Sequence, residues 1–394
     1  MNRKSFLRNA AILSLAAGVK GTAAFVKPGQ GFNENKPAPD GANAAANKLP
    51  AWKGFNLTDF NTPRPALNRK YTSEEQLQWI ADWGFNFVRL PIAYPYYLSF
   101  NKNRDIRPDE VFEFSNKRLD SIDNLVYLAH KHNLHVSLNM HRAPGYCVNA
   151  GFHEPYNLWK DKEAQDAFYF HWSMWAKRYK NVSGAKLSFD LLNEPSMRDD
   201  MNDQLSTSGP VPGALYHQVA KAALKVIHEQ NSSRIVIADG NSMGNTPIPE
   251  LADLPLAQSC RGYFPHAISH YKAPWANKEP EKLPVPVYPG KTGQQYFDKA
   301  AIEAYYKPWI ELMNKGVGIH CGECGAWNKT PHSVVLTWFK DVLDVLAANK
   351  IGFSLWEFSG DFGILNSRRT DVAYEEWHGQ QLDRQLLSLL QQYK

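Results

Sequence analysis

The feature that most constrains the fold of this chain is a regular alternation of short apolar runs with longer amphipathic segments. The runs are rich in Val, Ile, Phe and Leu and are bounded by turn residues, which is typical of β-strands. They predict strands over residues 52–57, 86–92, 135–141, 186–193, 234–239, 262–270, 318–323 and 352–357. Amphipathic segments with helical spacing lie at residues 73–83, 116–132, 162–179, 214–229, 296–315, 331–349 and 380–392.

Alternating strands and helices require a parallel sheet that is covered by helices. Eight such units predict a protein of the α/β class, a (β/α)8 TIM barrel that forms a single catalytic domain over residues 51–394. An open, doubly wound sheet is the alternative. Such a sheet normally carries a glycine-rich phosphate turn after its first strand, and residues 54–59, GFNLTD, contain none. In a barrel, polar residues at the carboxyl ends of the strands meet at one mouth, so the chemistry is sought there.

The first 24 residues have the composition of an export signal peptide. They contain four basic residues and no acidic ones, an apolar run at 10–17 that is too short to span a bilayer, and a tail of small residues. Residues 2–8, NRKSFLR, resemble a twin-arginine signal with Lys4 in place of the second arginine. An amphipathic N-terminal helix is the alternative. Residues 25–50 are rich in Pro, Gly, Asn and Ala and are predicted to be a flexible linker. We therefore expect a periplasmic or secreted protein.

The net charge of +5 comes from these first 50 residues and not from the predicted barrel. They hold seven of the 44 basic residues and two of the 39 acidic ones, which leaves 37 of each sign in residues 51–394. A neutral body has no excess of Lys and Arg to replace phosphate counterions, so we expect no nucleic-acid partner. No later segment approaches about 18 consecutive apolar residues, so we expect no membrane span.

Two predicted strands end in a glutamate with a specific context. The fourth ends FDLLNEP over residues 189–195, and the seventh ends IHCGECGAW over residues 319–327. Strands four and seven lie on opposite sides of an eight-stranded ring, so Glu194 and Glu323 can face each other across it. Two carboxylates about 5 to 5.5 Å apart are what retaining glycoside hydrolysis needs, because one protonates the leaving oxygen while the other attacks the anomeric carbon.

At these residues the chain resembles glycoside hydrolase family 5, a family of retaining (β/α)8 glycosidases that includes cellulases, and the resemblance extends from Trp52 to the last predicted helix. It implies that Glu194 is the acid/base, that Glu323 is the nucleophile and that Asn193 contacts the sugar 2-hydroxyl. The other matching residues are Arg89 in FVRLP, His141 in NMHRAP, His270 in SHYKAP and Trp356 in SLWEF.

Physical roles follow for the matching residues. Arg89 beside Glu323 would favour the ionised nucleophile, and a less polar surrounding would raise the pKa of Glu194 so that it keeps its proton. Trp356 offers a flat face for a pyranose ring, and Trp327 is expected as a second sugar contact. His141 and His270 are expected to be hydrogen-bond donors around the reacting sugar.

One position departs from the family pattern, which usually has a tyrosine two residues after the histidine of the sixth strand. This chain has Lys272 there. The adjacent Tyr271 is the candidate for the hydroxyl that contacts the nucleophile. A Lys272 that points inward would instead favour acidic sugars.

The four cysteines include one Cys-x-x-Cys pair, Cys321 and Cys324, but no second pair that could complete a metal site. We expect free, packed thiols, no metal and no cofactor. Simple strand alternation places Cys321 beneath Glu323, inside the barrel.

The sequence therefore predicts an exported, monomeric retaining β-glycoside hydrolase that acts on a β-glucan or related carbohydrate, most like an endo-β-1,4-glucanase. Alternatives within the family are an exo-acting β-glucosidase or β-1,3-glucanase and a β-mannanase. Transglycosylation with the same residues, and a carbohydrate-binding barrel without turnover, also stay open. The segments 198–213 and 274–290 are expected to form walls of the cleft.

Overall fold

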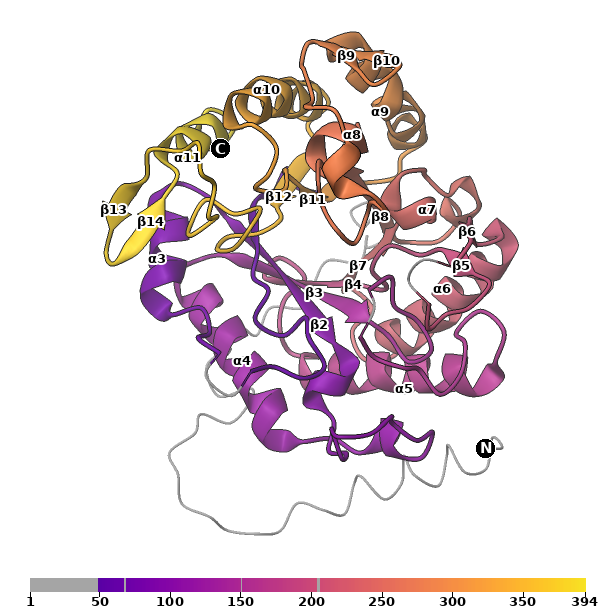
Figure 1. The fold of residues 1–394 in the computed structure, drawn as a ribbon. Helices are drawn as coiled ribbons and strands as arrows, with labels where there is room; N and C mark the ends of the chain where they lie inside the picture. The colour runs from indigo at the N-terminus through magenta and orange to yellow at the C-terminus, as the bar shows by residue number, and fades with distance from the viewer. Residues whose placement is uncertain (1–48, 67–68, 150, 204–205) are drawn as a thin grey trace.

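The computed structural model describes residues 49–66, 69–149, 151–203 and 206–394 (Figure 1). The predicted signal peptide and almost all of the predicted linker lie outside these residues. Within them, eight parallel strands close into a barrel in the ring order β1-β12-β11-β8-β7-β4-β3-β2. The strands are β1 (Lys53–Asn56), β2 (Phe87–Ala93), β3 (His135–Arg142), β4 (Leu187–Asp190), β7 (Ile235–Asp239), β8 (Ala257–Gly262), β11 (Ile319–Cys324) and β12 (Gly352–Leu355). The predicted fold class is confirmed.

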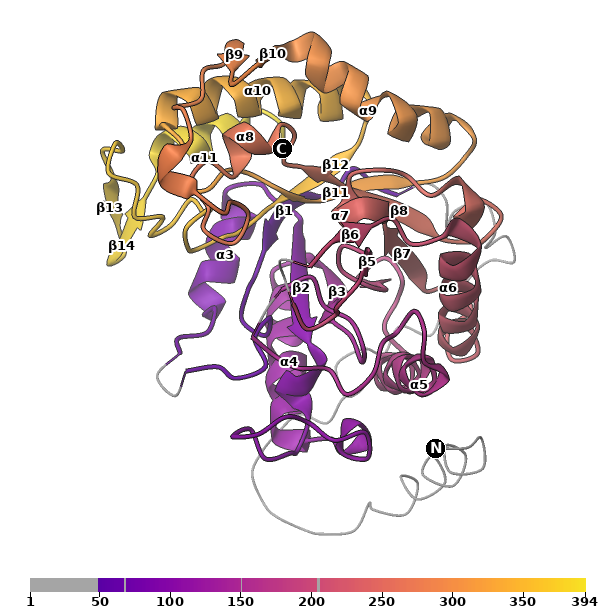
Figure 2. The ribbon, with the colours of Figure 1, turned by 45° about the vertical axis from the view of Figure 1, so that its right-hand side comes forward.

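Long helices form a layer around the barrel, and α9 and α10 lie side by side in both views (Figures 1 and 2). They are α3 (Glu74–Asp82), α4 (Asn116–Lys131), α5 (Lys162–Arg178), α6 (Gly213–His228), α9 (Lys299–Asn314), α10 (His332–Ala348) and α11 (Arg384–Gln391). The alternation is incomplete at one place, because β7 and β8 are joined by only a short helix, α7 (Asn241–Gly244), and a 3-10 turn. In the described ranges, no helix is both long enough and apolar enough to cross a bilayer.

The amino end of the barrel interior is filled by large apolar side chains. Trp52, Phe87, Ile237 and Ala257 form a buried cluster there, and the ring of His135 stacks on Trp52 with centroids 3.9 Å apart. Burying a large apolar side chain contributes about 1.5–3 kcal/mol to folding, so this floor stabilises the closed ring. Polar side chains occupy the opposite end of the barrel, at the carboxyl ends of the strands.

The prediction for the sixth strand was wrong, because this strand is β8 (Ala257–Gly262) and not residues 262–270. The side chains of β8 that enter the barrel near its mouth are Ser259 and Arg261, so the strand lacks the apolar run that marks the others. The predicted segment contains Pro265, which precedes the short helix α8 (His266–Ser269).

Two predicted helices begin later than expected, because short hairpins precede them. Strand β10 (Gln295–Phe297) pairs with β9 (Gly290–Thr292), and α9 starts only after Asp298 accepts a hydrogen bond from the N–H of Ala301. In the same way β14 (Gln380–Leu382) pairs with β13 (Glu375–Trp377), and Asp383 caps α11. In both cases an aspartate at the N-cap fixes the start of the helix.

The placement of Cys321 inside the barrel was also wrong. Strand β11 contains a bulge, since Cys321 pairs with Cys260 while Glu323 pairs with the next residue of β8, Arg261. One extra residue, Gly322, breaks the alternation of faces. Glu323 therefore faces the mouth, while Cys321 joins Cys260 and Cys324 in the core between strands and helices. All four cysteines of the chain are buried free thiols.

Candidate active site

The carboxyl ends of the eight strands bring polar side chains together at one mouth of the barrel. Each strand contributes at least one, either within the strand or soon after its last residue. These residues are Asn56 (β1), Arg89 (β2), His141 (β3), Asn193 and Glu194 (after β4), Asp239 (β7), Arg261 (β8), Glu323 (β11) and Trp356 (after β12).

Glu323 is held on both carboxylate oxygens. Nη1 of Arg89 donates a hydrogen bond to its Oε1 over 2.6 Å, and the hydroxyl of Tyr263 donates to its Oε2 over 3.2 Å. Nη2 of Arg261 lies 3.4 Å from the same Oε1. Glu323 is only 4% exposed, so its carboxylate is held by contacts within the protein.

Arg89 organises the centre of the mouth. Its Nε donates to Asp190 over 2.8 Å, Nη1 also donates to Oδ1 of Asn56 over 3.0 Å, and Nη2 donates to Oδ1 of Asn193 over 3.0 Å. A planar guanidinium with several fixed partners has little freedom to turn. The position of the Glu323 carboxylate is therefore set by strands β1, β2 and β4 as well as by its own strand.

Glu194 follows β4, and its side chain is 15% exposed. Nε of Arg261 donates to its Oε1 over 3.0 Å, and its backbone N–H donates to Oδ2 of Asp239 over 2.9 Å. Burial and the negative charge of Glu323 raise the pKa of Glu194 to about 7, although the charge of Arg261 opposes this. A carboxyl group with this pKa still carries a proton near neutral pH, as a general acid must.

Two further carboxyl groups lie deeper in the mouth. Burial would raise the pKa of Asp239, but its ion pairs with two arginines outweigh burial and lower the pKa below its usual range. Burial and the charge of Asp239 raise the pKa of Asp190 to about 7. Asp190 and Glu194 thus both have a pKa near neutrality.

Neutral hydrogen-bonding groups complete the mouth. Burial lowers the pKa of His141 to about 4, and burial together with His266 lowers that of His270 to about 3. Both imidazoles are therefore uncharged near neutral pH. Oδ1 of Asn193 accepts from two arginines, whereas no partner for its Nδ2 is found among the described residues. This amide can donate to a ligand.

These side chains open into a cleft of ≈ 370 Å³. The residues that line it are His141, Asn149, Asn193, Glu194, Tyr263, His270, Trp275, Glu323, Trp356 and Phe362. The ring of His141 stacks on Trp356 with centroids 5.3 Å apart and an angle of 13° between the planes. Most of the candidate residues expected from the sequence thus meet in one cleft, with Arg89 directly beneath it.

Three candidates lie elsewhere. Trp327 does not line this cleft and packs edge-on against Trp275, with centroids 4.5 Å apart. Tyr271 is buried outside the cleft, and the residue that contacts Glu323 is Tyr263. Lys272 does not point inward, because its Nζ pairs with Glu281 over 2.9 Å near the surface.

Sequence reasoning missed Tyr263, Arg261 and Asp239. Asp239 ends a correctly predicted strand, so its position alone could have marked it. The expected tyrosine of the sixth strand lies two residues after a histidine, and here Tyr263 lies two residues after Arg261. Because the sixth strand is expected at residues 262–270, Arg261 falls outside it, and this spacing cannot be recognised from the sequence. His270, which the sequence pattern assigns to the end of the sixth strand, lies instead at the end of α8.

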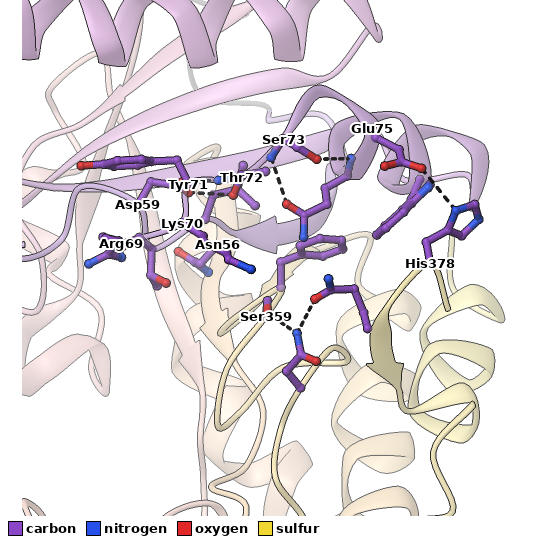
Figure 3. Close-up of a pocket in the computed structure, with 17 residues that line it drawn as sticks. Asn56, Asp59, Arg69, Lys70, Tyr71, Thr72, Ser73, Glu75, Ser359 and His378 are labelled. Carbon is purple, nitrogen blue, oxygen red and sulfur yellow. Dashed lines mark hydrogen bonds and ion pairs between the residues drawn. The ribbon is translucent and has the colours of Figure 1, made fainter. Parts of the chain in front are cut away.

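A second, polar hollow of ≈ 420 Å³ lies where the chain leaves β1 and β12 (Figure 3). Asn56, which donates to the backbone of β11 and accepts from Arg89, is part of its wall. Ser359, from the loop after β12, and His378, between β13 and β14, line it from the other side. His378 also pairs with Glu75 over 3.3 Å, which ties the hairpin to α3.

A (β/α)8 barrel with two glutamates in one cleft, among arginine, histidine and tryptophan at its mouth, is an architecture typical of glycoside hydrolases. Comparison with known proteins gives the family. A model of the family described as cellulase (glycosyl hydrolase family 5) matches residues 43–361, and the chain therefore belongs to glycoside hydrolase family 5. It is an enzyme that hydrolyses O-glycosyl bonds.

Named relatives agree with this assignment. The chain is 27% identical to endoglucanase C of Acetivibrio thermocellus over 331 residues, which are 77% of this chain and 89% of the relative. It is 27% identical to cellodextrinase A of Ruminococcus flavefaciens over 308 residues, 76% of this chain and 83% of the relative. A solved structure described as a glycoside hydrolase has 36% identity and a TM-score of 0.76, with 87% of this chain and 99% of that chain covered.

Proposed function

We propose that this chain is an exported retaining β-glycoside hydrolase that acts on a β-glucan in the manner of an endo-β-1,4-glucanase. The observation that carries the proposal is the pairing of a glutamate whose pKa is raised to about 7, Glu194, with a glutamate held by Arg89 and Tyr263, Glu323, in one cleft. Glu194 can donate a proton, while Glu323, held in the same cleft, can attack the anomeric carbon.

In the first step Glu194 gives its proton to the glycosidic oxygen while an oxygen of Glu323 attacks the anomeric carbon. The bond to the leaving group breaks, and a covalent glycosyl ester with Glu323 forms. In the second step the ionised Glu194 takes a proton from water, whose oxygen attacks the same carbon and releases Glu323. The sugar configuration is thereby retained.

A retaining mechanism needs the two carboxylates close together, and the contacts of Arg261 support this. Its Nε lies 3.0 Å from Oε1 of Glu194 and its Nη2 lies 3.4 Å from Oε1 of Glu323. A single guanidinium thus contacts both groups, which is compatible with a separation of about 5–5.5 Å.

The cleft also supplies sugar contacts. Trp356 presents its ring on one wall, and its stacking on His141 fixes the orientation of that ring. Nδ2 of Asn193, which has no partner among the described residues, is proposed to donate to the 2-hydroxyl, a contact that strengthens in the transition state. His270, uncharged near neutral pH, is a further contact for sugar hydroxyls.

A β-glucan is favoured by the names of the relatives, an endoglucanase and a cellodextrinase. Endo action is proposed from the same names, since one of these relatives is an endoglucanase. The alternatives are exo attack and mannan as substrate. The test is hydrolysis of β-1,4-glucan, β-1,3-glucan and β-mannan with analysis of product lengths. Early oligosaccharides of mixed length from β-1,4-glucan are expected, whereas monosaccharide alone, or preference for another polymer, contradicts this assignment.

Export is proposed from residues 1–24. It is tested by cell fractionation of the full chain and of a variant that starts at residue 25. We expect activity outside the cytoplasm only for the full chain, and equal distribution of the two proteins argues against a signal.

A further inference from the structure

Arg261 is an unusual feature of this mouth, because it is a fully buried cation that contacts both candidate catalytic glutamates. Its exposure is 0%, and it approaches Glu194 and Glu323 with different nitrogens of one guanidinium. Resting on the function proposed above, we propose that Arg261 is a positioning residue that fixes the carboxyl group of Glu194 relative to Glu323 and keeps a permanent positive charge between them.

The first support is a closed ring of contacts around Glu194. Nη1 and Nη2 of Arg261 both donate to Asp239, the first over 3.1 Å, and Asp239 in turn accepts the backbone N–H of Glu194 over 2.9 Å. Nε of Arg261 then reaches the carboxyl group of the same glutamate. Both the backbone and the side chain of Glu194 are thus tied to the same arginine–aspartate pair.

The second support is the backbone conformation of Glu194. Its φ is +50°, a left-handed value that residues other than glycine rarely adopt. Pro195 follows it and further restricts its backbone. Such a conformation persists only where the surroundings hold it. The contacts that hold it are the N–H bond to Asp239 and a hydrogen bond from the Tyr146 hydroxyl to the Glu194 carbonyl.

The third support is the permanence of the charge. A guanidinium stays protonated throughout the working pH range, so its effect on Glu194 does not vary with pH. The other charged or titratable groups that act on Glu194 come from several elements. They are Glu323 (β11), Asp239 (β7), Tyr263 (after β8), Tyr305 (α9) and Tyr146 (after β3). Glu323 and Asp239 add negative charge, so Arg261 is the group in this set that stabilises the ionised form of Glu194.

The proposal predicts a change in the pH profile, which a merely structural arginine would not produce. Arg261→Lys keeps the charge, whereas Arg261→His is largely neutral above pH 7 and Arg261→Gln is neutral throughout. Removing the charge lets Glu194 keep its proton to higher pH. The alkaline limb of kcat/KM should therefore move up by about one unit or more in the His and Gln variants, and by much less in the Lys variant. All three should lower kcat, because the carboxyl group loses its fixed partner.

The control is Arg234→Gln, a second buried arginine that donates to backbone carbonyls far from the mouth. It should lower the melting temperature without moving the limb. If Arg261→Gln does not fold, the positions of the alkaline limb in Arg261→His and Arg261→Lys are compared instead. An alkaline limb that stays in place in folded Arg261→His, or that moves equally in the Lys variant, overturns the proposal.

Covalent labelling with a 2-fluoro glycoside distinguishes failure of the proposal for Arg261 from failure of the proposed function. If the wild-type protein forms the adduct on Glu323 and the limb does not move, only the role of Arg261 is wrong. If the wild-type protein forms no adduct, the proposed function itself is contradicted.

Discussion

The hydroxyl of Tyr263 donates to Oε2 of Glu323 over 3.2 Å, while Arg89 donates to Oε1 of the same carboxylate over 2.6 Å. The two donors come from different parts of the chain and hold opposite oxygens. The carboxylate therefore cannot turn without losing a contact, and its orientation toward the cleft is set before a substrate arrives. Such preorganisation is a main source of enzymatic rate enhancement.

Tyr263→Phe removes one of these donors and keeps the ring. Because a hydrogen bond to a charged group is worth about 1.5–3 kcal/mol, we expect kcat to fall roughly 10- to 100-fold. Tyr271→Phe is the matched control and should leave kcat unchanged. Equal effects of the two substitutions would contradict the contact described here.

Glu194→Ala removes the proton donor of the first step. We expect hydrolysis of unactivated β-glucosides to fall roughly 10²- to 10⁴-fold, the range for loss of general acid–base catalysis. An aryl glycoside with a good leaving group needs no proton, so its glycosylation step should be nearly unaffected. Added azide should then restore turnover and give a β-glycosyl azide. An equal loss on both substrates without azide rescue would rule out this role.

The pH dependence of kcat/KM should show an alkaline limb near pH 7. The pKa of Glu194 is raised to about 7, so the acid form that catalysis needs is present below this pH and is lost as the pH rises through it. The pKa of Asp190 is also raised to about 7, so the experiment must distinguish the titration of Glu194 from that of Asp190. Glu194→Gln, assayed with an activated aryl glycoside, should lack the limb. A limb that persists in this variant would assign it to another group.

Trp356→Ala should weaken substrate binding, because its ring lines the cleft and is held by His141. We expect KM to rise about tenfold or more, which corresponds to at least 1.4 kcal/mol of lost contact. Trp327→Ala is the comparison, since Trp327 supports Trp275 from behind and does not line the cleft. It should have the smaller effect on KM, and the reverse order would place the sugar on the other tryptophan.

The positions of Glu194 and Glu323 could be predicted from the sequence because the alternation located both strands and each glutamate has a specific context, NEP for Glu194 and GECG for Glu323. The same alternation predicted the barrel. The sixth strand could not be located in this way, because its residues near the mouth, Ser259 and Arg261, are polar and face inward. The inward-facing Arg261 is balanced by ion pairs with residues that are far away in the sequence. A pattern read from neighbouring residues does not contain these partners.

The bulge at Gly322 shows a second limit. A Cβ atom added there would lie 2.5 Å from Oγ of Ser259, so a larger residue would force a neighbour to shift. Strict alternation from Cys321 would place the wrong side chains in the barrel. The bulge becomes visible only when β11 is paired with β8, and pairing is a tertiary property.

The proposed mechanism is attack of Glu323 on the anomeric carbon with a proton supplied by Glu194. Its most direct test is treatment of the protein with a 2-deoxy-2-fluoro β-glucoside or β-cellobioside that carries an activated leaving group, followed by peptide mass spectrometry. We expect loss of activity with one equivalent of sugar attached to the peptide containing Glu323, and no labelling of Glu323→Gln. A label on a different residue, or turnover by Glu323→Gln within about 10⁴-fold of the wild-type rate, would contradict it.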